Sequence, residues 1–169
     1  MAQTSKSAEV KVIKGKKAFE EEVKEATKKV DASLQLSLVG AAVYNGTGKA
    51  LHNLETHFWY GTPFSFPDIP DDGGAIVLSL GDYPNGAVYA PVYVDGPGNT
   101  ARMFFFAVDT SAEKIYAQSG PVGPIDWNVV KVKLGESGSE SIYVDPVLGG
   151  KVVAKVKGNF AVATFCNNY

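Results

Sequence analysis

The sequence predicts a mainly β fold, a β-sandwich flanked by an N-terminal amphipathic helix. From residue 35 onward, short runs rich in Val, Ala, Tyr and Phe alternate with Gly, Pro, Asn and Asp, and only one earlier segment has helical spacing. Repeated short strands without intervening helices favour a sandwich over βαβ units. The chain has 169 residues and 45% apolar content, which is enough for one domain with its own core.

The helical spacing lies in residues 16–34, where apolar side chains recur every three or four positions between Lys and Glu residues. This pattern predicts a helix that buries one narrow stripe. The stripe consists of Phe19, Val23, Ala26, Val30 and Leu34. We therefore divide the single domain into an N-terminal arm with this helix, 1–34, and a β-sandwich body, 35–169.

Several runs of the body alternate by twos, as strands with one buried face do. In residues 151–157 three apolar side chains oppose three lysines, and in residues 129–134 three apolar side chains share one face. We expect both segments to be strands. In the run Phe104–Phe106, alternation requires that at least one ring points away from its neighbours.

The segment 57–70, HFWYGTPFSFPDIP, is unusually rich in aromatic side chains. Alternation predicts that Phe58 faces the core and that Trp59 or Tyr60 faces outward. We expect Phe64 and Phe66, on the following loop, to form part of an exposed membrane- or ligand-facing edge. Exposed Trp and Tyr suit a lipid interface or the face of a sugar, so lipids and glycans are both candidate partners.

Composition argues against several other functions. The net charge of −2, without a cluster of Lys and Arg, gives no reason to expect nucleic acid binding. His52 and His57 lack the partners of a catalytic triad or a zinc site, so we expect structural or surface histidines, no enzyme activity, no metal and no cofactor. The aspartates of residues 68–72 could hold calcium, but the spacing favours an acidic turn.

Cysteine usage and hydropathy bear on the compartment. Cys166 is the single cysteine, which rules out an intrachain disulfide. Residues 1–8 are polar, and the chain has neither an apolar run of signal-peptide length nor eighteen consecutive apolar residues. We therefore expect a soluble chain without an export signal.

Five stretches, taken in order, resemble the actinoporins, the pore-forming cytolysins of sea anemones, and the wider actinoporin-like group. The resemblance covers most of the chain and rests on the order and spacing of scattered identities. The stretches are SAEVKVIKGKKAFEE, LVGAAVYNGTGKALHNLETHFWYGT, PNGAVYAPVYVDGPGNTARMFFFAVD, DWNVVKVKLG and SESIYVDPVLGG.

This resemblance implies a compact sandwich whose aromatic loops adsorb to lipid headgroups and whose N-terminal helix detaches and enters the bilayer. It also implies a monomer in solution that forms a homo-oligomer on membranes. Such a protein would be secreted or released and membrane-associated if it is cytolytic, and cytoplasmic otherwise.

The chain departs from the family at the positions that bind the lipid headgroup in that family. The family builds a phosphocholine pocket from serines and tyrosines, and the matching positions here hold Tyr60, Phe105, Ala107, Tyr143, Val147 and Leu148. Tyr143 alone keeps the residue type. The aromatic loop of the family is replaced by residues 110–125, which leaves Tyr116 and Trp127 nearby. The predicted binding residues are therefore Trp59, Tyr60, Phe64, Phe66, Tyr116, Trp127 and Tyr143, with the headgroup unassigned.

The sequence leaves two candidate functions, which belong to different classes. The first is a pore-forming cytolysin that adsorbs through its aromatic loops and inserts its N-terminal helix. The narrow stripe and flanking lysines of that helix oppose deep insertion, because each Lys at a bilayer centre costs about 2.5–3.5 kcal/mol. The alternative is a non-lytic lectin-like module that binds a carbohydrate or lipid, since fungal fruit-body lectins share this sandwich without a pore-forming helix.

Overall fold

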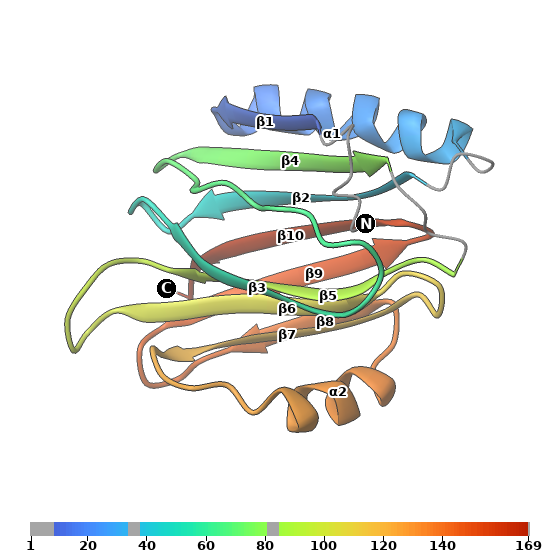
Figure 1. Cartoon of the computed structure of the whole chain (residues 1–169). Coiled ribbons are helices and arrows are strands. Elements are labelled where there is room, and N and C mark those ends of the chain that lie inside the picture. The colour runs from blue at the N-terminus through green and yellow to red at the C-terminus, as the bar shows by residue number, and fades with distance from the viewer. Residues whose placement is uncertain (1–8, 34–37, 81–84, 169) are drawn as a thin grey trace.

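The computed structural model describes residues 9–33, 38–80 and 85–168 as a β-sandwich with a helix packed outside each sheet (Figure 1). The predicted mainly β sandwich with an N-terminal helix is confirmed. The elements in chain order are β1 (Glu9–Lys14), α1 (Lys16–Ala32), β2 (Leu38–Gly46), β3 (His52–Tyr60), β4 (Gly73–Leu80), β5 (Val88–Val94), β6 (Arg102–Asp109), β7 (Lys114–Pro121), α2 (Trp127–Gly135), β8 (Glu140–Val144), β9 (Gly150–Lys157) and β10 (Phe160–Asn167).

The two sheets differ in width. One has six strands in the order β1-β4-β2-β10-β9-β8, and the other has four in the order β3-β5-β6-β7. The pairing of β10 with β2 is parallel, with Phe160 opposite Gly40, whereas the other described pairs are antiparallel. The wider sheet extends past the narrower one at β1, whose Val10 and Val12 are about half exposed, at 46% and 50%.

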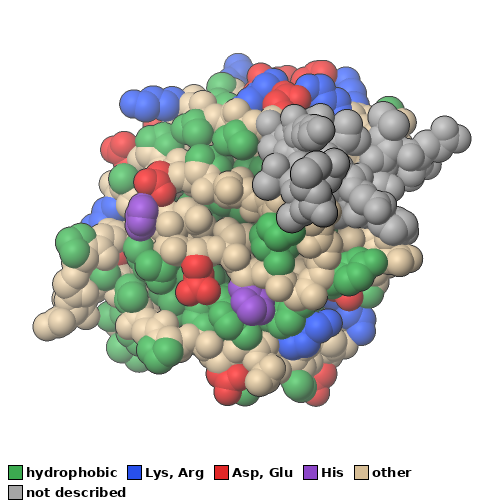
Figure 2. Space-filling model, viewed as in Figure 1, with side chains coloured by type: hydrophobic (Ala, Val, Ile, Leu, Met, Phe, Trp, Pro, Cys, Tyr) green, Lys and Arg blue, Asp and Glu red, His purple; other side chains and the backbone are tan. Residues whose placement is uncertain are grey.

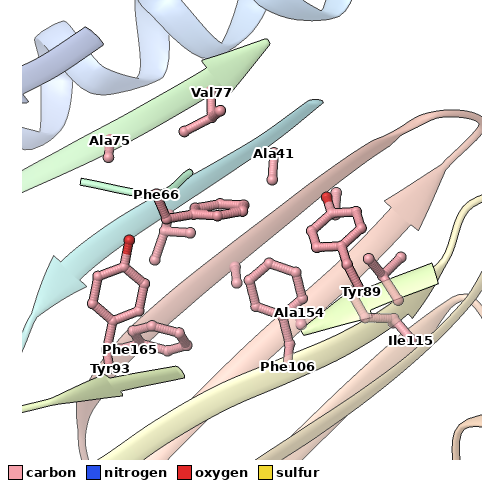
Figure 3. Close-up of a cluster of buried hydrophobic side chains, with 14 of the residues drawn as sticks. Ala41, Phe66, Ala75, Val77, Tyr89, Tyr93, Phe106, Ile115, Ala154 and Phe165 are labelled. Atoms are coloured by element: carbon pink, nitrogen blue, oxygen red, sulfur yellow. The ribbon is translucent and has the colours of Figure 1, made fainter. Parts of the chain in front are cut away.

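The main core lies between the sheets and is rich in aromatic rings (Figure 3). Tyr89, Phe106 and Phe165 are fully buried there, and Phe165 contacts rings of the opposite sheet at centroid distances of 5.5–6.5 Å. Each such side chain stabilises the fold by roughly 1.5–3 kcal/mol relative to exposure. The predicted alternation in 151–157 is confirmed, since Val152, Ala154 and Val156 of β9 face this core.

The run Phe104–Phe106 shows that the four-stranded sheet is buried on both faces. Phe104 and Phe106 point into the inter-sheet core, and Phe105 points outward, yet all three are fully buried. The whole of β5 and nearly all of β6 are likewise buried. A sheet with two apolar faces needs a cover on each side, and here α2 covers the outer face.

The segment 129–134 belongs to helix α2, so the strand prediction for it is wrong. The carboxylate of Asp126 accepts hydrogen bonds from the backbone N–H groups of Asn128 and Val129, which caps the first turn. Val130 and Leu134, four positions apart, are buried against the sheet. The spacing of the apolar residues in this segment is compatible with a strand and also with one face of a short helix. The Asp126 cap favours the helix.

A second correction concerns the segment before α2. Residues 114–121 form strand β7, which pairs with β6 along its whole length, whereas the family resemblance placed residues 110–125 in the position of a loop. Tyr116 and Gln118 alternate with Ile115 and Ala117, the two side chains that face the inter-sheet core. This alternation is itself a strand signal, and reading the segment as the counterpart of a family loop left it unused.

Helix α1 covers β1, β4 and β2 on the outer face of the six-stranded sheet (Figure 1). Phe19 lies directly over Gly74, where a Cβ atom would clash with the ring, and packs on Tyr44 at a centroid distance of 5.4 Å. Ala26 and Val30 are buried and Val23 is partly buried in the same contact. The predicted stripe is confirmed at these four positions, and Leu34 lies outside the described residues.

Strand β1 fixes the start of the arm. It forms the edge of the six-stranded sheet, paired with β4 from Glu9 opposite Leu78 to Lys14 opposite Gly73. Lys11 of β1 reaches Glu22 of α1 at 3.1 Å, and Glu9 reaches Lys29 at 3.3 Å. Because these ion pairs are about half exposed, they contribute at most about 1 kcal/mol each. Most of the attachment therefore comes from strand pairing and from the apolar stripe.

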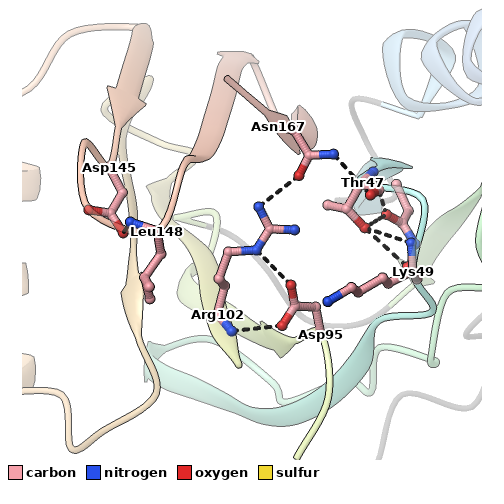
Figure 4. Close-up of polar contacts among 8 residues, drawn as sticks. Thr47, Lys49, Asp95, Arg102, Asp145, Leu148 and Asn167 are labelled. Atoms are coloured by element: carbon pink, nitrogen blue, oxygen red, sulfur yellow. Dashed lines mark hydrogen bonds and ion pairs between the residues drawn. The ribbon is translucent and has the colours of Figure 1, made fainter. Parts of the chain in front are cut away.

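A buried polar chain closes one end of the sandwich (Figure 4). The Arg102 Nε atom lies 2.7 Å from Asp95 Oδ2, and the Arg102 backbone N–H donates to Asp95 Oδ1 at 2.7 Å. The guanidinium also donates to Asn167 of β10, which donates in turn to the Thr47 carbonyl. The chain thereby joins β5 and β6 of one sheet to β10 and the β2–β3 turn of the other.

We expect Asp95→Ala to lower the free energy of unfolding by about 3–5 kcal/mol, because Arg102 is left as an unpaired charge with 9% of its side chain exposed. Urea unfolding measures this change. The control Glu22→Ala removes an exposed pair and should cost about 1 kcal/mol or less. Equal losses in the two variants would contradict the structural role of the buried pair.

Candidate functional site

The strongest candidate site is a set of rings on the outer face of the four-stranded sheet, which we call the aromatic surface. His57 and Trp59 lie two positions apart on β3, so they share that face, and Trp127 begins α2 beside them. Tyr60 ends β3 next to a register shift between Phe58 and Tyr60. Tyr116 lies on β7 and completes the aromatic surface.

The centre of the aromatic surface is a three-ring contact. The His57 ring stacks on Trp127 with a centroid distance of 4.4 Å and an interplanar angle of 6°. It meets Trp59 edge-on at 4.6 Å, and the two indoles are 5.5 Å apart. Beneath them, Trp127 contacts the buried Phe105 ring at 5.9 Å. The three rings are thus held in fixed positions while each keeps part of its surface exposed.

The electrostatics of the aromatic surface are nearly neutral at its centre. Partial burial lowers the pKa of His57, and the nearby Glu55 carboxylate opposes this effect only partly. His57 is therefore uncharged at neutral pH. Lys133 of α2 lies at the edge, with its ammonium 5.7 Å from the Tyr116 ring centroid.

Helix α2 adds exposed apolar side chains beside the rings. Val129 and Val132, three positions apart on one side of the helix, are 47% and 62% exposed, and Val122 before the helix is 44% exposed. Figure 2 shows hydrophobic side chains gathered around one of the two histidines on this face. These valines add exposed apolar surface on the same outer side of the four-stranded sheet as the rings, which suits an apolar partner.

Four of the seven predicted binding residues lie together on the aromatic surface: Trp59, Tyr60, Tyr116 and Trp127. Tyr60 is 46% exposed, and its hydroxyl accepts a hydrogen bond from Asn85 Nδ2 at 3.3 Å. The outward position predicted for Trp59 or Tyr60 is confirmed. Phe58 packs against the core as predicted.

The remaining three predicted residues lie elsewhere. Phe64 and Phe66 are each only 6% exposed and contact Tyr89 inside the sandwich, so the prediction that they form an exposed edge is wrong. The β3–β4 loop folds its rings inward because the four-stranded sheet leaves part of the wider sheet to be covered. Tyr143, on β8, is partly buried against the inter-sheet core and does not join the aromatic surface.

Aspartates of the acidic turn, residues 68–72, form hydrogen bonds with neighbouring strands of the same chain. Asp68 accepts a hydrogen bond from the Asn53 backbone N–H at 2.8 Å and pairs with His52 Nδ1 at 3.0 Å, and these two contacts lower the Asp68 pKa. Asp72 accepts a hydrogen bond from the Tyr44 hydroxyl at 3.0 Å. Within residues 9–33, 38–80 and 85–168, no group of three His, Cys, Asp or Glu side chains is placed to hold a metal ion.

Sequence reasoning missed His57, Val129 and Val132. Reading 129–134 as a strand placed Val132 on a buried face, whereas the helix turns it to solvent. The Asp126 cap followed by apolar residues at 130 and 134 is the signal that identifies the helix. No local pattern could pair His57 with Trp127, because the two are far apart in sequence.

Comparison with known proteins supports the fold. No family model matches the chain, and neither does any curated protein sequence. Among solved structures, the crystal structure of "lipid binding protein Nakanori" has a TM-score of 0.59 and 14% identity, over 87% of this chain and 78% of that chain. At this identity the likeness shows the fold alone, and it is consistent with the actinoporin-like fold.

We expect the indole fluorescence of the native protein to titrate with a midpoint below pH 6.5, because both tryptophans of the chain contact His57, whose pKa is lowered. A lowered pKa for a base means that the unfolded chain binds more protons, so stability falls as the pH decreases below 6.5. The transition should be missing in His57→Gln. A midpoint above 6.5 would contradict this burial of His57.

Proposed function

We propose that the protein binds lipid bilayer surfaces through the aromatic surface and the exposed valines of α2. The observation that carries the proposal is the orientation of α2, which buries Val130 and Leu134 and still presents Val129 and Val132 to solvent. A helix that packs on a core normally turns polar side chains outward. Apolar side chains in that position favour a second apolar environment.

The rings beside α2 suit the depth of a headgroup region. Indole and phenol rings combine an apolar body with a polar group, and such rings collect at membrane–water interfaces. Lys131 and Lys133 alternate with the exposed valines and would lie near lipid phosphates. The uncharged state of His57 at neutral pH avoids the cost of bringing a cation into this interface.

The structural neighbour supports the same class of function. Nakanori is described as a lipid binding protein, and it shares this fold over most of both chains. We further propose that the protein binds rather than catalyses, because the stacked and edge-on contacts of His57 pack its imidazole among the rings of the aromatic surface.

Pore formation and membrane oligomerisation are finer proposals that the family resemblance motivates. Among the described residues, no helix is long and apolar enough to cross a bilayer. For α1 to insert, β1 must separate from β4, and Ala42, Ile76 and Leu78 must lose the cover of Phe19 and Val30. The lectin alternative stays a prediction, because no finding bears on glycan binding.

We expect Val132→Asp to weaken cosedimentation with phosphatidylcholine vesicles by about tenfold or more, because a charge then enters the contact in place of an apolar group. The matched control is Val147→Asp, at a position 82% exposed in the β8–β9 turn, which should bind as the unmodified chain does. Equal binding by both variants would sink the proposal. Release of an entrapped dye from the same vesicles tests pore formation separately.

A further inference from the structure

A groove beside α1 lies on the face of the molecule that carries no part of the aromatic surface. It has a volume of about 450 Å³ and runs between the second half of α1 and strands β9 and β10. Val23 of α1 with Phe160 and Val162 of β10 give it apolar walls. The volume corresponds to on the order of fifteen waters, so a small ligand group can enter.

Charges of both signs surround these apolar walls. Lys155 and Lys157 extend from β9, and Asp31, Glu113 and Glu140 come from α1, the β6–β7 turn and the start of β8. Glu140 and Lys155 are directly opposite each other in the β8–β9 register, yet they form no ion pair in the described structure. None of the five has an ion-pair partner among the described residues, so all five can meet a ligand.

We propose that this groove binds the phosphoethanolamine headgroup of a membrane lipid. Two ammonium groups suit the phosphate, and three carboxylates suit a primary ammonium, which donates three hydrogen bonds. A quaternary choline has no N–H to donate and prefers a cage of aromatic rings, whereas Phe160, the single ring that lines the groove, is only 5% exposed. The charge pattern therefore selects ethanolamine over choline.

The position of the groove is compatible with the proposed membrane contact, and this inference rests on that proposed function. The end of α1, the β9–β10 turn and the end of α2 lie at the same end of the sandwich, at the right of Figure 1. Residues 136–139 alone separate α2 from β8, whose first residue lines the groove. A bilayer that covers this end of the sandwich would contact the end of α2 and the mouth of the groove together.

Glu113 offers a test variant that should not harm the fold. Its backbone φ of 51° lies in the left-handed region, where a side chain costs about 1–2 kcal/mol and glycine is relaxed. Glu113→Gly therefore removes one carboxylate while stability is kept or raised. For the phosphate side, Lys157→Gln has a matched control in Lys151→Gln, which removes the same charge from β9 outside the groove.

The experiment compares binding of the full chain to vesicles of phosphatidylcholine with and without phosphatidylethanolamine. We expect phosphatidylethanolamine to strengthen binding by about two- to fivefold, the effect of a few exposed charge contacts. Glu113→Gly and Lys157→Gln should lose this gain, and Lys151→Gln should keep it. Glycerophosphoethanolamine, but not glycerophosphocholine, should shift the backbone amide resonances of β9 and β10 in the unmodified chain.

The outcomes separate this inference from the proposed function. Binding to both vesicles with no gain from phosphatidylethanolamine, or a gain that survives in the groove variants, overturns the groove assignment and leaves the α2 contact standing. Loss of all vesicle binding in Val132→Asp, with the amide shifts from glycerophosphoethanolamine unchanged, supports both sites. Absence of those shifts in the unmodified chain overturns the groove assignment.

Discussion

The contact between α2 and the outer face of the four-stranded sheet is the constraint on which the rest of the structure depends. Phe105 points out of the sandwich and is still fully buried, because it contacts Trp127 and lies in one buried cluster with Val130 and Leu134 of α2. Without that cover the sheet would expose an apolar layer on its outer side. The same contact fixes the Trp127 indole against His57 and thereby builds the aromatic surface. Packing and the proposed function thus share one set of side chains.

The sandwich, α1 and most strands could be predicted from the sequence because the apolar residues of each element are close together in the chain. Within each element they repeat with a single period, that of a helix or that of a strand. The stripe of α1 and the alternation of β9 are of this kind. The apolar residues of segment 129–134 fit both the two-residue period of a strand and the spacing of a helix face. The preceding Asp126, which caps the helix, is the signal that separates the two. Phe64 and Phe66 were misplaced because their burial depends on the unequal widths of the two sheets, which appear only in the tertiary structure.

The two helices have different relations to their sheets. Helix α1 rests on half of a six-stranded sheet through a few side chains, with Phe19 over Gly74 as the closest fit. It leaves the outer sides of β9 and β8 open, where Ile142 and Val153 are exposed and the charged groove lies. Helix α2 packs over β6 and β7 of its sheet and keeps an apolar outer side. Adsorption through α2 therefore requires no change in the fold, whereas insertion of α1 would require a sheet edge to open.

The most direct test of the central claim is the environment of residue 132 on a bilayer. A polarity-sensitive fluorophore is attached to Val132→Cys in a Cys166→Ser background, and a second protein carries it at Val147→Cys. The account predicts that phosphatidylcholine vesicles shift the emission of the label at position 132 to shorter wavelength and leave the label at position 147 unchanged. An unchanged emission at position 132, or the same shift at both positions, would contradict it.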